Sequence, residues 1–186
     1  RVHHFTAEGP SEALGELVLP DPSHSILQLV DMLGDERQEL VCMDSKGARA
    51  YTLTDDGVFG EVVNLASRAR CRMRPGRPVF SNIVSDVNGD GQPDLMVPTR
   101  NAVQLWLASA STEEGAPLTL RRAATVSVRV SNDESASTET LGDELRSAFT
   151  VPGLSTMDVN GDGRQDLLVS DGHLRAFHIQ SEDGTY

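Results

Sequence analysis

Short runs of hydrophobic residues, many of them alternating with polar ones, recur along the chain between turns rich in Gly, Asp and Asn. Runs of this length and spacing are typical of β-strands, so the sequence predicts an all-β fold. Weaker patterns suggest one more strand at 17–19 and a short helix at 141–147. The main predicted strands are 25–30, 41–43, 49–54, 61–65, 79–85, 95–98, 102–108, 118–130, 149–157, 167–170 and 174–180.

The turns divide these strands into three units behind a leading segment at 1–24. The first unit is 25–77, the second 78–147 and the third 148–186. Each complete unit is expected to hold four short antiparallel strands, and the third ends before a fourth strand is complete. The second unit contains a polar, acidic stretch at 131–140, which we interpret as an inserted surface loop. A period of this size is typical of repeat architectures.

One decapeptide occurs twice, as DVNGDGQPDL at 86–95 and DVNGDGRQDL at 158–167. Oxygen-bearing side chains stand at its positions 1, 3, 5 and 9, and glycines at positions 4 and 6. Short Asp and Asn side chains on alternate residues of a tight turn can converge on one hard cation, and Ca²⁺ takes six to eight oxygens at about 2.3–2.6 Å. The glycines permit the positive φ that such a turn requires.

An altered copy precedes them at 31–40. Asp31, Asp35 and Glu39 keep the acidic positions 1, 5 and 9. Leu33 replaces the ligand at position 3, and Glu36 replaces the glycine at position 6. We expect this copy to keep the hairpin but to have lost, or nearly lost, the metal, since Ca²⁺ affinity follows ligand charge and rigidity.

The decapeptide differs from an EF-hand, which supplies a bidentate Glu at position 12 and continues into a helix. Here position 12 is Val97 or Val169, inside a short apolar run. The predicted unit is therefore a strand, a calcium loop and a second strand.

This arrangement resembles the FG-GAP/VCBS repeats of the integrin α-chain β-propeller and of many bacterial secreted proteins. The resemblance covers roughly 78–108 and 149–180, and more weakly 25–65. It implies about three β-propeller blades, each a four-stranded antiparallel sheet. Because propellers have four to eight blades, an incomplete propeller is implied, which belongs to a longer polypeptide or assembles with other copies or subunits.

By this resemblance, each complete loop binds one Ca²⁺, giving two sites with a structural role. Side-chain oxygens come from positions 1, 3, 5 and 9 and a backbone carbonyl from position 7. The implied ligands are Asp86, Asn88, Asp90, Gln92 and Asp94 in one loop and Asp158, Asn160, Asp162, Arg164 and Asp166 in the other. Val87, Val159, Leu95 and Leu167 are expected to point into the core.

The charge of −12 over 186 residues argues against a nucleic-acid partner, which would require clustered Lys and Arg. The basic stretch 68–77 is the exception, and we interpret it as a solvated loop. There is no run of eighteen apolar residues that could span a membrane. Because it begins at Arg1 without a signal peptide, the chain reads as a mature or excised piece, which is compatible with secretion.

Two cysteines, Cys42 and Cys71, permit one disulfide, and two free thiols are an equally open alternative. Without a CxxC pair or a Cys/His cluster, zinc is not expected. Trp106 is expected to pack between units.

The sequence contains no G-x-S-x-G, HExxH or P-loop motif, so no enzymatic activity or catalytic residue is predicted. His173 and His178 should face opposite sides of a strand. We expect a calcium-stabilised, non-enzymatic module of a secreted, cell-surface or periplasmic protein that binds protein or carbohydrate, as in adhesion. The alternative is an accessory propeller domain of an extracellular enzyme of the polysaccharide lyase or phospholipase type.

Overall fold

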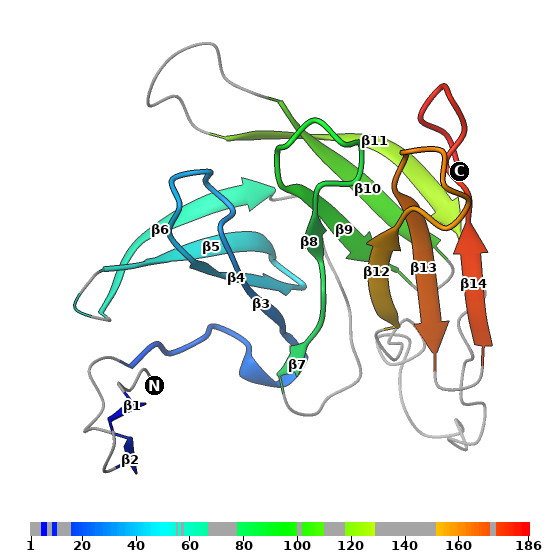
Figure 1. The fold of residues 1–186 in the computed structure, drawn as a ribbon. Helices are drawn as coiled ribbons and strands as arrows, with labels where there is room; N and C mark the ends of the chain where they lie inside the picture. Colours follow the sequence, from blue (N-terminus) through cyan, green and yellow to red (C-terminus); the bar gives the residue numbers. More distant parts are fainter. Residues whose placement is uncertain are drawn as a thin grey trace, which may run out of the picture.

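The computed structural model describes residues 5–6, 9–10, 16–54, 56, 58–66, 78–99, 102–109, 118–128, 152–171 and 174–186. This part of the chain is all-β, with one 3-10 turn at Pro22–His24, and no helix in it is long and apolar enough to cross a bilayer. A small hairpin pairs β1 (Phe5–Thr6) with β2 (Gly9–Pro10). The other strands form three larger sheets that follow one another along the chain (Figure 1).

The first sheet has the strand order β6-β5-β4-β3-β7. Its strands are β3 (Ile26–Val30), β4 (Glu39–Asp44), β5 (Gly47–Leu53), β6 (Phe59–Ala66) and β7 (Val79–Phe80). Neighbouring strands are antiparallel except β3 and β7, which are parallel.

The second sheet has the order β11-β10-β9-β8 and the third the order β12-β13-β14, all antiparallel. The second contains β8 (Val84–Ser85), β9 (Asp94–Pro98), β10 (Ala102–Ser109) and β11 (Thr119–Ser127). The third contains β12 (Gly153–Met157), β13 (Asp166–Asp171) and β14 (Leu174–His178).

The single strand predicted at 79–85 is wrong, because the chain breaks there into β7 and β8, which belong to different sheets. The side chain of Gln28 occupies the break. Its Oε1 accepts hydrogen bonds from the backbone N–H groups of Ile83 (2.5 Å) and Val84 (2.8 Å), and its Nε2 donates to the carbonyl of Val84 (3.0 Å). These bonds satisfy buried backbone groups that a strand partner would otherwise satisfy.

The strand predicted at 17–19 is also wrong, since residues 16–20 adopt no strand. Leu17 and Leu19 instead pack against a small core cluster formed by Leu27, Cys42 and Tyr51. The segment therefore adds apolar contacts without adding to the sheet. The predicted helix at 141–147, the insertion at 131–140, the basic stretch at 68–77, Cys71 and His173 lie outside the described residues.

The main cores lie between consecutive sheets. We call the side of a sheet that faces the next sheet along the chain its forward face, and the other side its back face. One core joins the forward face of the first sheet, including Val41, to Leu95 and Val97 on the back face of the second. Trp106 packs against this core, between the units as predicted. Another joins the forward face of the second sheet to the back face of the third.

Val87, Leu95 and Leu167 are buried as predicted, but the same prediction for Val159 is wrong, because its side chain is exposed. Val87 packs in the core between the second and third sheets. Val159 occupies the same position in the next loop, beside the forward face of the third sheet. No further sheet covers that face within the described part of the chain.

Candidate metal-binding loops

The three decapeptides form the loops between β3 and β4, between β8 and β9, and between β12 and β13. Each connects two antiparallel strands of one sheet. Figure 1 shows all three loops along the same edge of the molecule, at the top of the view. The repeated sequence therefore produces a row of loops with acidic side chains.

The carboxylate of Asp86 organises the second loop. Its Oδ1 accepts hydrogen bonds from the backbone N–H groups of Gly89 (2.7 Å) and Asp90 (3.2 Å), and its Oδ2 accepts one from Gly91 (2.9 Å). Gly89 and Gly91 have φ values of 77° and 83°, in the region that glycine enters without steric cost. The loop is thus folded around its first aspartate by its own backbone.

The third loop repeats these contacts. Asp158 accepts from Gly161 (2.7 Å), Asp162 (3.1 Å) and Gly163 (2.8 Å). Each distance is within 0.1 Å of its counterpart around Asp86. Two copies 72 residues apart therefore adopt one geometry.

Positions 3 and 5 contact each other in both complete loops. The amide nitrogen of Asn88 donates to Asp90 Oδ2 (2.9 Å), and Asn88 Oδ1 accepts from the backbone N–H of Asp90 (3.0 Å). Asn160 and Asp162 make the same two contacts, at 2.8 and 3.0 Å. The structure brings these predicted ligands together on the exposed side of each loop.

Position 9 has a different role, because Asp94 is fully buried. Its Oδ2 accepts from the backbone N–H of Val87 (2.9 Å) and its Oδ1 from that of Ala108, on β10 (2.8 Å). Burial raises the pKa of Asp94, hydrogen bonds from the backbone of Ala108, Val87 and Asn88 oppose that rise, and the nearby charge of Asp90 adds to it. This carboxylate ties its loop to the next strand of the sheet.

Asp166 makes the equivalent contacts in the third loop. It accepts from the backbone N–H of Val159 (2.9 Å) and of Gln180 (2.8 Å), just after β14. A carboxylate has about four lone-pair sites, so these contacts leave capacity for a further interaction.

Arg164 contributes more than the sequence predicted, which assigned it only a backbone carbonyl. Its Nη2 lies 2.5 Å from Asp162 Oδ2, and its Nε donates to the carbonyl of Gln180 (3.0 Å). The pKa of Asp162 is lowered, first by the hydrogen bond from the backbone N–H of Arg164, then by Asn160 and the Arg164 charge. The uncharged Gln92 at this position of the second loop gave no signal for such a contact.

The altered first loop keeps the same turn. Asp31 accepts from the backbone N–H groups of Gly34 (2.7 Å), Asp35 (3.2 Å) and Glu36 (2.9 Å). Glu36 takes the place of a glycine and has φ of 68°, which makes it the one non-glycine residue with positive φ in the described part of the chain. A side chain in this conformation costs about 1–2 kcal/mol, so the backbone of this loop is strained at Glu36.

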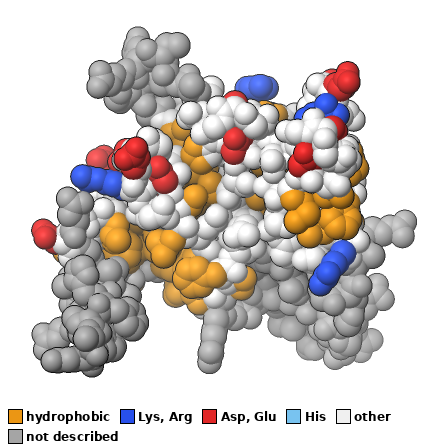
Figure 2. All heavy atoms as spheres, viewed as in Figure 1, with side chains coloured by type: hydrophobic (Ala, Val, Ile, Leu, Met, Phe, Trp, Pro, Cys, Tyr) orange, Lys and Arg blue, Asp and Glu red, His pale blue; other side chains and the backbone are white. Residues whose placement is uncertain are grey.

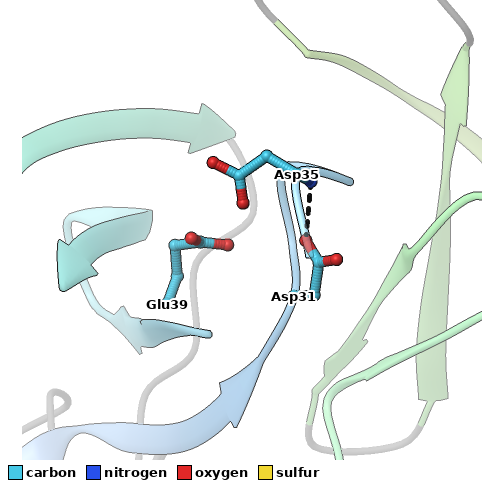
Figure 3. A group of neighbouring side chains, drawn as sticks. All are labelled: Asp31, Asp35 and Glu39. Atoms are coloured by element: carbon cyan, nitrogen blue, oxygen red, sulfur yellow. Dashed lines mark hydrogen bonds between the residues drawn. The ribbon is translucent and has the colours of Figure 1, made fainter. Parts of the chain in front are cut away.

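The acidic side chains of the first loop lie close to one another. Figure 3 shows the carboxylates of Asp31, Asp35 and Glu39, each of which places one oxygen within 4.8 Å of the others. Among described residues, this distance is not met by the three carboxylates of either complete loop. Glu39 is longer than Asp by one methylene, and its Oε2 accepts from the backbone N–H groups of Met32 (2.8 Å) and Leu33 (3.2 Å). Burial, the leading influence, raises the pKa of Glu39.

The donor sets of the two complete loops fit a hard cation. Each offers three carboxylates and one side-chain amide, all from short side chains on one turn, and no soft ligand. Such a set suits Ca²⁺ and Mg²⁺ rather than zinc or copper. The first loop has Leu33 at position 3, so at positions 1, 3, 5 and 9 its side chains offer three carboxylates and no amide oxygen.

Two other polar groups are buried away from the loops. Cys42 is a free, buried thiol whose pKa is raised by burial. Nε2 of His178 is buried and has no hydrogen-bond partner among the described residues, and burial lowers the pKa of His178. Neither lies among the predicted ligands.

No known family's sequence profile matches the chain, and no curated protein matches it. One solved structure, the Tc holotoxin pore of Photorhabdus luminescens, matches 86% of this chain at 20% identity with a TM-score of 0.43. The match covers 6% of that toxin chain, so the present chain spans a small part of its length. A likeness at this TM-score does not establish a shared fold.

Proposed function

We propose that this chain is a calcium-stabilised, non-enzymatic β-propeller segment whose two complete loops each bind one Ca²⁺. The observation that carries this proposal is that both loops combine one shared geometry with side-chain oxygens at positions 1, 3, 5 and 9, whereas the altered first loop lacks the oxygen at position 3. Asp86 and Asp158 each accept three backbone N–H groups at matching distances, although 72 residues separate them. The three consecutive sheets with cores between them support the propeller interpretation.

In this proposal the residues at positions 1, 3, 5 and 9 hold the ion by side-chain oxygens, and those at position 7 by a backbone carbonyl. They are Asp86, Asn88, Asp90, Gln92 and Asp94 in one loop and Asp158, Asn160, Asp162, Arg164 and Asp166 in the other. A bound Ca²⁺ supplies positive charge that offsets the mutual repulsion of three carboxylates.

The residues at position 9 explain why such an ion would stabilise the sheet. Asp94 joins its loop to β10, and Asp166 joins its loop to the segment after β14. Any ligand that orders these carboxylates also orders the third strand of the sheet. The role of the ion is therefore structural, and it holds a hairpin and the strand beside it.

Calcium loops with this ligand set suit the millimolar Ca²⁺ outside cells. We therefore infer a secreted, cell-surface or periplasmic protein in which the module binds protein or carbohydrate. The acidic charge of −12 supports a partner other than nucleic acid. Binding to a glycan array without hydrolysis supports this role, and turnover by this chain alone would exclude it.

The metal proposal is tested by native mass spectrometry and thermal melting, with and without a chelator. We expect two bound Ca²⁺ ions per chain, and a melting temperature that falls by several degrees on chelation and recovers with added Ca²⁺. The variants Asp90→Asn and Asp162→Asn should each remove one ion. Gln38→Asn, an exposed change in the first loop, is the matched control. An unchanged melting curve and no bound ion would refute the proposal.

A further inference from the structure

Equivalent positions in the three sheets differ in exposure. Position 2 of the loops is Met32, Val87 and Val159, whose side chains are 0%, 1% and 44% exposed. The first two are buried because the next sheet covers them, in the cores between first and second and between second and third sheets. The third lies beside the forward face of the third sheet.

Equivalent residues on the strands differ in exposure in the same way. Ala50 pairs with Val41, Leu105 with Met96, and Phe177 with Leu168, so the three form one equivalent set. Their exposures are 0%, 2% and 50%.

Four exposed hydrophobic residues mark the forward face of the third sheet: Met157, Val159, Phe177 and Ile179. Figure 2 shows hydrophobic side chains gathered on the molecular surface over β12, β13 and β14. Phe177 pairs with Leu168, whose neighbours Leu167 and Val169 are buried on the back face. Side chains alternate along a strand, so Phe177 and Leu168 face away from the second sheet. The third sheet is thus apolar on both faces, as sheets covered on both sides are.

The back face of the first sheet offers a matching surface. Leu27, Leu40 and Cys42 there occupy the register positions that Leu154, Leu167 and Val169 occupy on the back face of the third sheet. The latter three form the side of the core that packs on the second sheet.

Leu17 and Leu19 cover part of that back face, but part remains open. Leu29 pairs with Leu40, and Phe80 pairs with Leu27, which places both on this side of the sheet. Their side chains are 57% and 70% exposed. Large exposed apolar residues grouped on one surface mark an interaction site.

We propose that the forward face of the third sheet binds the back face of the first sheet of a second copy of this chain. This contact continues the forward-to-back packing that occurs twice within the chain, with the same residue classes at the same register positions. It buries Phe177 and Val159 of one copy against Leu29 and Phe80 of the other.

A head-to-tail contact between identical chains either closes into a ring or grows into a filament. Two copies with three sheets each give six sheets, within the range of four to eight blades found in closed propellers. The ring, but not the contact, depends on the propeller proposed above. The contact itself rests on apolar packing and not on metal, so it is measured separately with Ca²⁺ present and after chelation.

The test is light scattering coupled to size-exclusion chromatography over a range of concentrations. Wild type should have the mass of two copies, or of a concentration-dependent series. The variants Phe177→Arg and Phe80→Arg should each be monomeric. An equimolar mixture of the two variants should form a heterodimer, because one copy retains an intact forward face and the other an intact back face. Val58→Arg, an exposed change in the turn between β5 and β6, should associate like wild type.

Wild type that stays monomeric at every concentration would overturn the proposal. So would a Phe80→Arg variant that associates like wild type while Phe177→Arg does not, since that result indicates contact between two forward faces. Circular dichroism of each variant verifies folding, and recovery in the mixture could not come from misfolded chains. Wild type that associates but binds no Ca²⁺ when the ion is supplied would leave the contact in place and refute the metal proposal alone.

Discussion

The side-chain amide of Gln180 donates a hydrogen bond over 3.3 Å to the backbone carbonyl of Val87, which lies 93 residues earlier in the chain. Gln180 is buried, and its own backbone N–H donates to Asp166 Oδ1 at 2.8 Å. One residue therefore contacts the third loop through its main chain and the second loop through its side chain. Its amide also donates to the hydroxyl of Tyr186, which in turn donates to the carbonyl of Gln165.

Replacement of Gln180 by Ala removes the side-chain hydrogen bonds to Val87 in the second loop and to Tyr186, whose hydroxyl contacts Gln165 in the third loop, so it should weaken both loops. We expect the free energy of unfolding to fall by about 1–3 kcal/mol, because the buried carbonyl of Val87 loses its partner. Calcium affinity should fall at both loops, which calorimetric titration of the variant would show. The exposed Gln38→Ala serves as control. A loss of calcium affinity confined to one of the two loops would contradict this coupling.

Substitutions of Asp86 and Asn88 should lower the free energy of unfolding by different amounts once calcium is removed. Asp86→Ala leaves three backbone N–H groups without their acceptor, so we expect a loss of about 1–2 kcal/mol even in chelator, similar to loss of a helix cap. Asn88→Ala should cost less than this in chelator, since it removes only the two side-chain hydrogen bonds with Asp90. Both should abolish one calcium site. Urea melts with and without chelator separate the two effects.

Glu36 and Gly91 occupy the same loop position with positive φ, and substitutions there should have opposite signs. Glu36→Gly should raise the free energy of unfolding by about 0.5–1 kcal/mol, because the left-handed strain is relieved and part of the gain is offset by glycine's entropy. Gly91→Ala should lower it by about 1 kcal/mol. A Cβ at Gly91 would meet nothing within 4 Å, so the effect is one of backbone conformation. Chemical denaturation measures both, and equal signs would contradict the argument.

Substitutions of Val87 and Val159 compare the same loop position with and without a covering sheet. Val87→Ala should cost about 2 kcal/mol, since it leaves a cavity in the core between the second and third sheets. Val159→Ala should change the free energy of unfolding by less than about 0.5 kcal/mol in a monomeric background such as Phe80→Arg. Equal costs would mean that Val159 is covered within the monomer.

His178 should make stability depend on pH. Burial lowers its pKa from an ordinary value of about 6.5, so the unfolded chain binds a proton more readily than the folded one. The contribution of neutral His178 to the free energy of unfolding is fully present above about pH 6.5. It is lost as the pH falls from there toward the lowered pKa. Thermal melts of wild type and His178→Leu in chelator should diverge below this pH, with the variant losing less. Parallel profiles would contradict this assignment.

Much of the site was predictable from the sequence, because a loop that folds on its own side chains is encoded locally. The turn around Asp86 depends on residues within five positions of it. The strands that follow, such as β9 and β13, were predicted to within a residue or two because their apolar runs are short and bounded.

The features that the sequence did not predict depend on distant contacts. The break between β7 and β8 depends on Gln28, 55 residues before Ile83. The exposure of Val159 follows from the absence of a covering sheet in the described chain, although its local sequence matches that of Val87. The anchoring of Asp94 to Ala108 required the position of β10, which the decapeptide alone does not specify.

The parallel pairing of β7 with β3 means that the unit boundary in the sequence is not the boundary in the folded protein. Residues 79 and 80 precede the second decapeptide loop in the chain, yet they complete the first sheet. A protein cut after residue 77 would expose the hydrogen-bonding edge of β3, which is a site for aggregation. During synthesis, the first sheet gains its last strand only as the second unit emerges from the ribosome. The second unit thus begins with the residues that complete the first sheet, and a division after Ser81, unlike one before Pro78, keeps this edge of β3 covered.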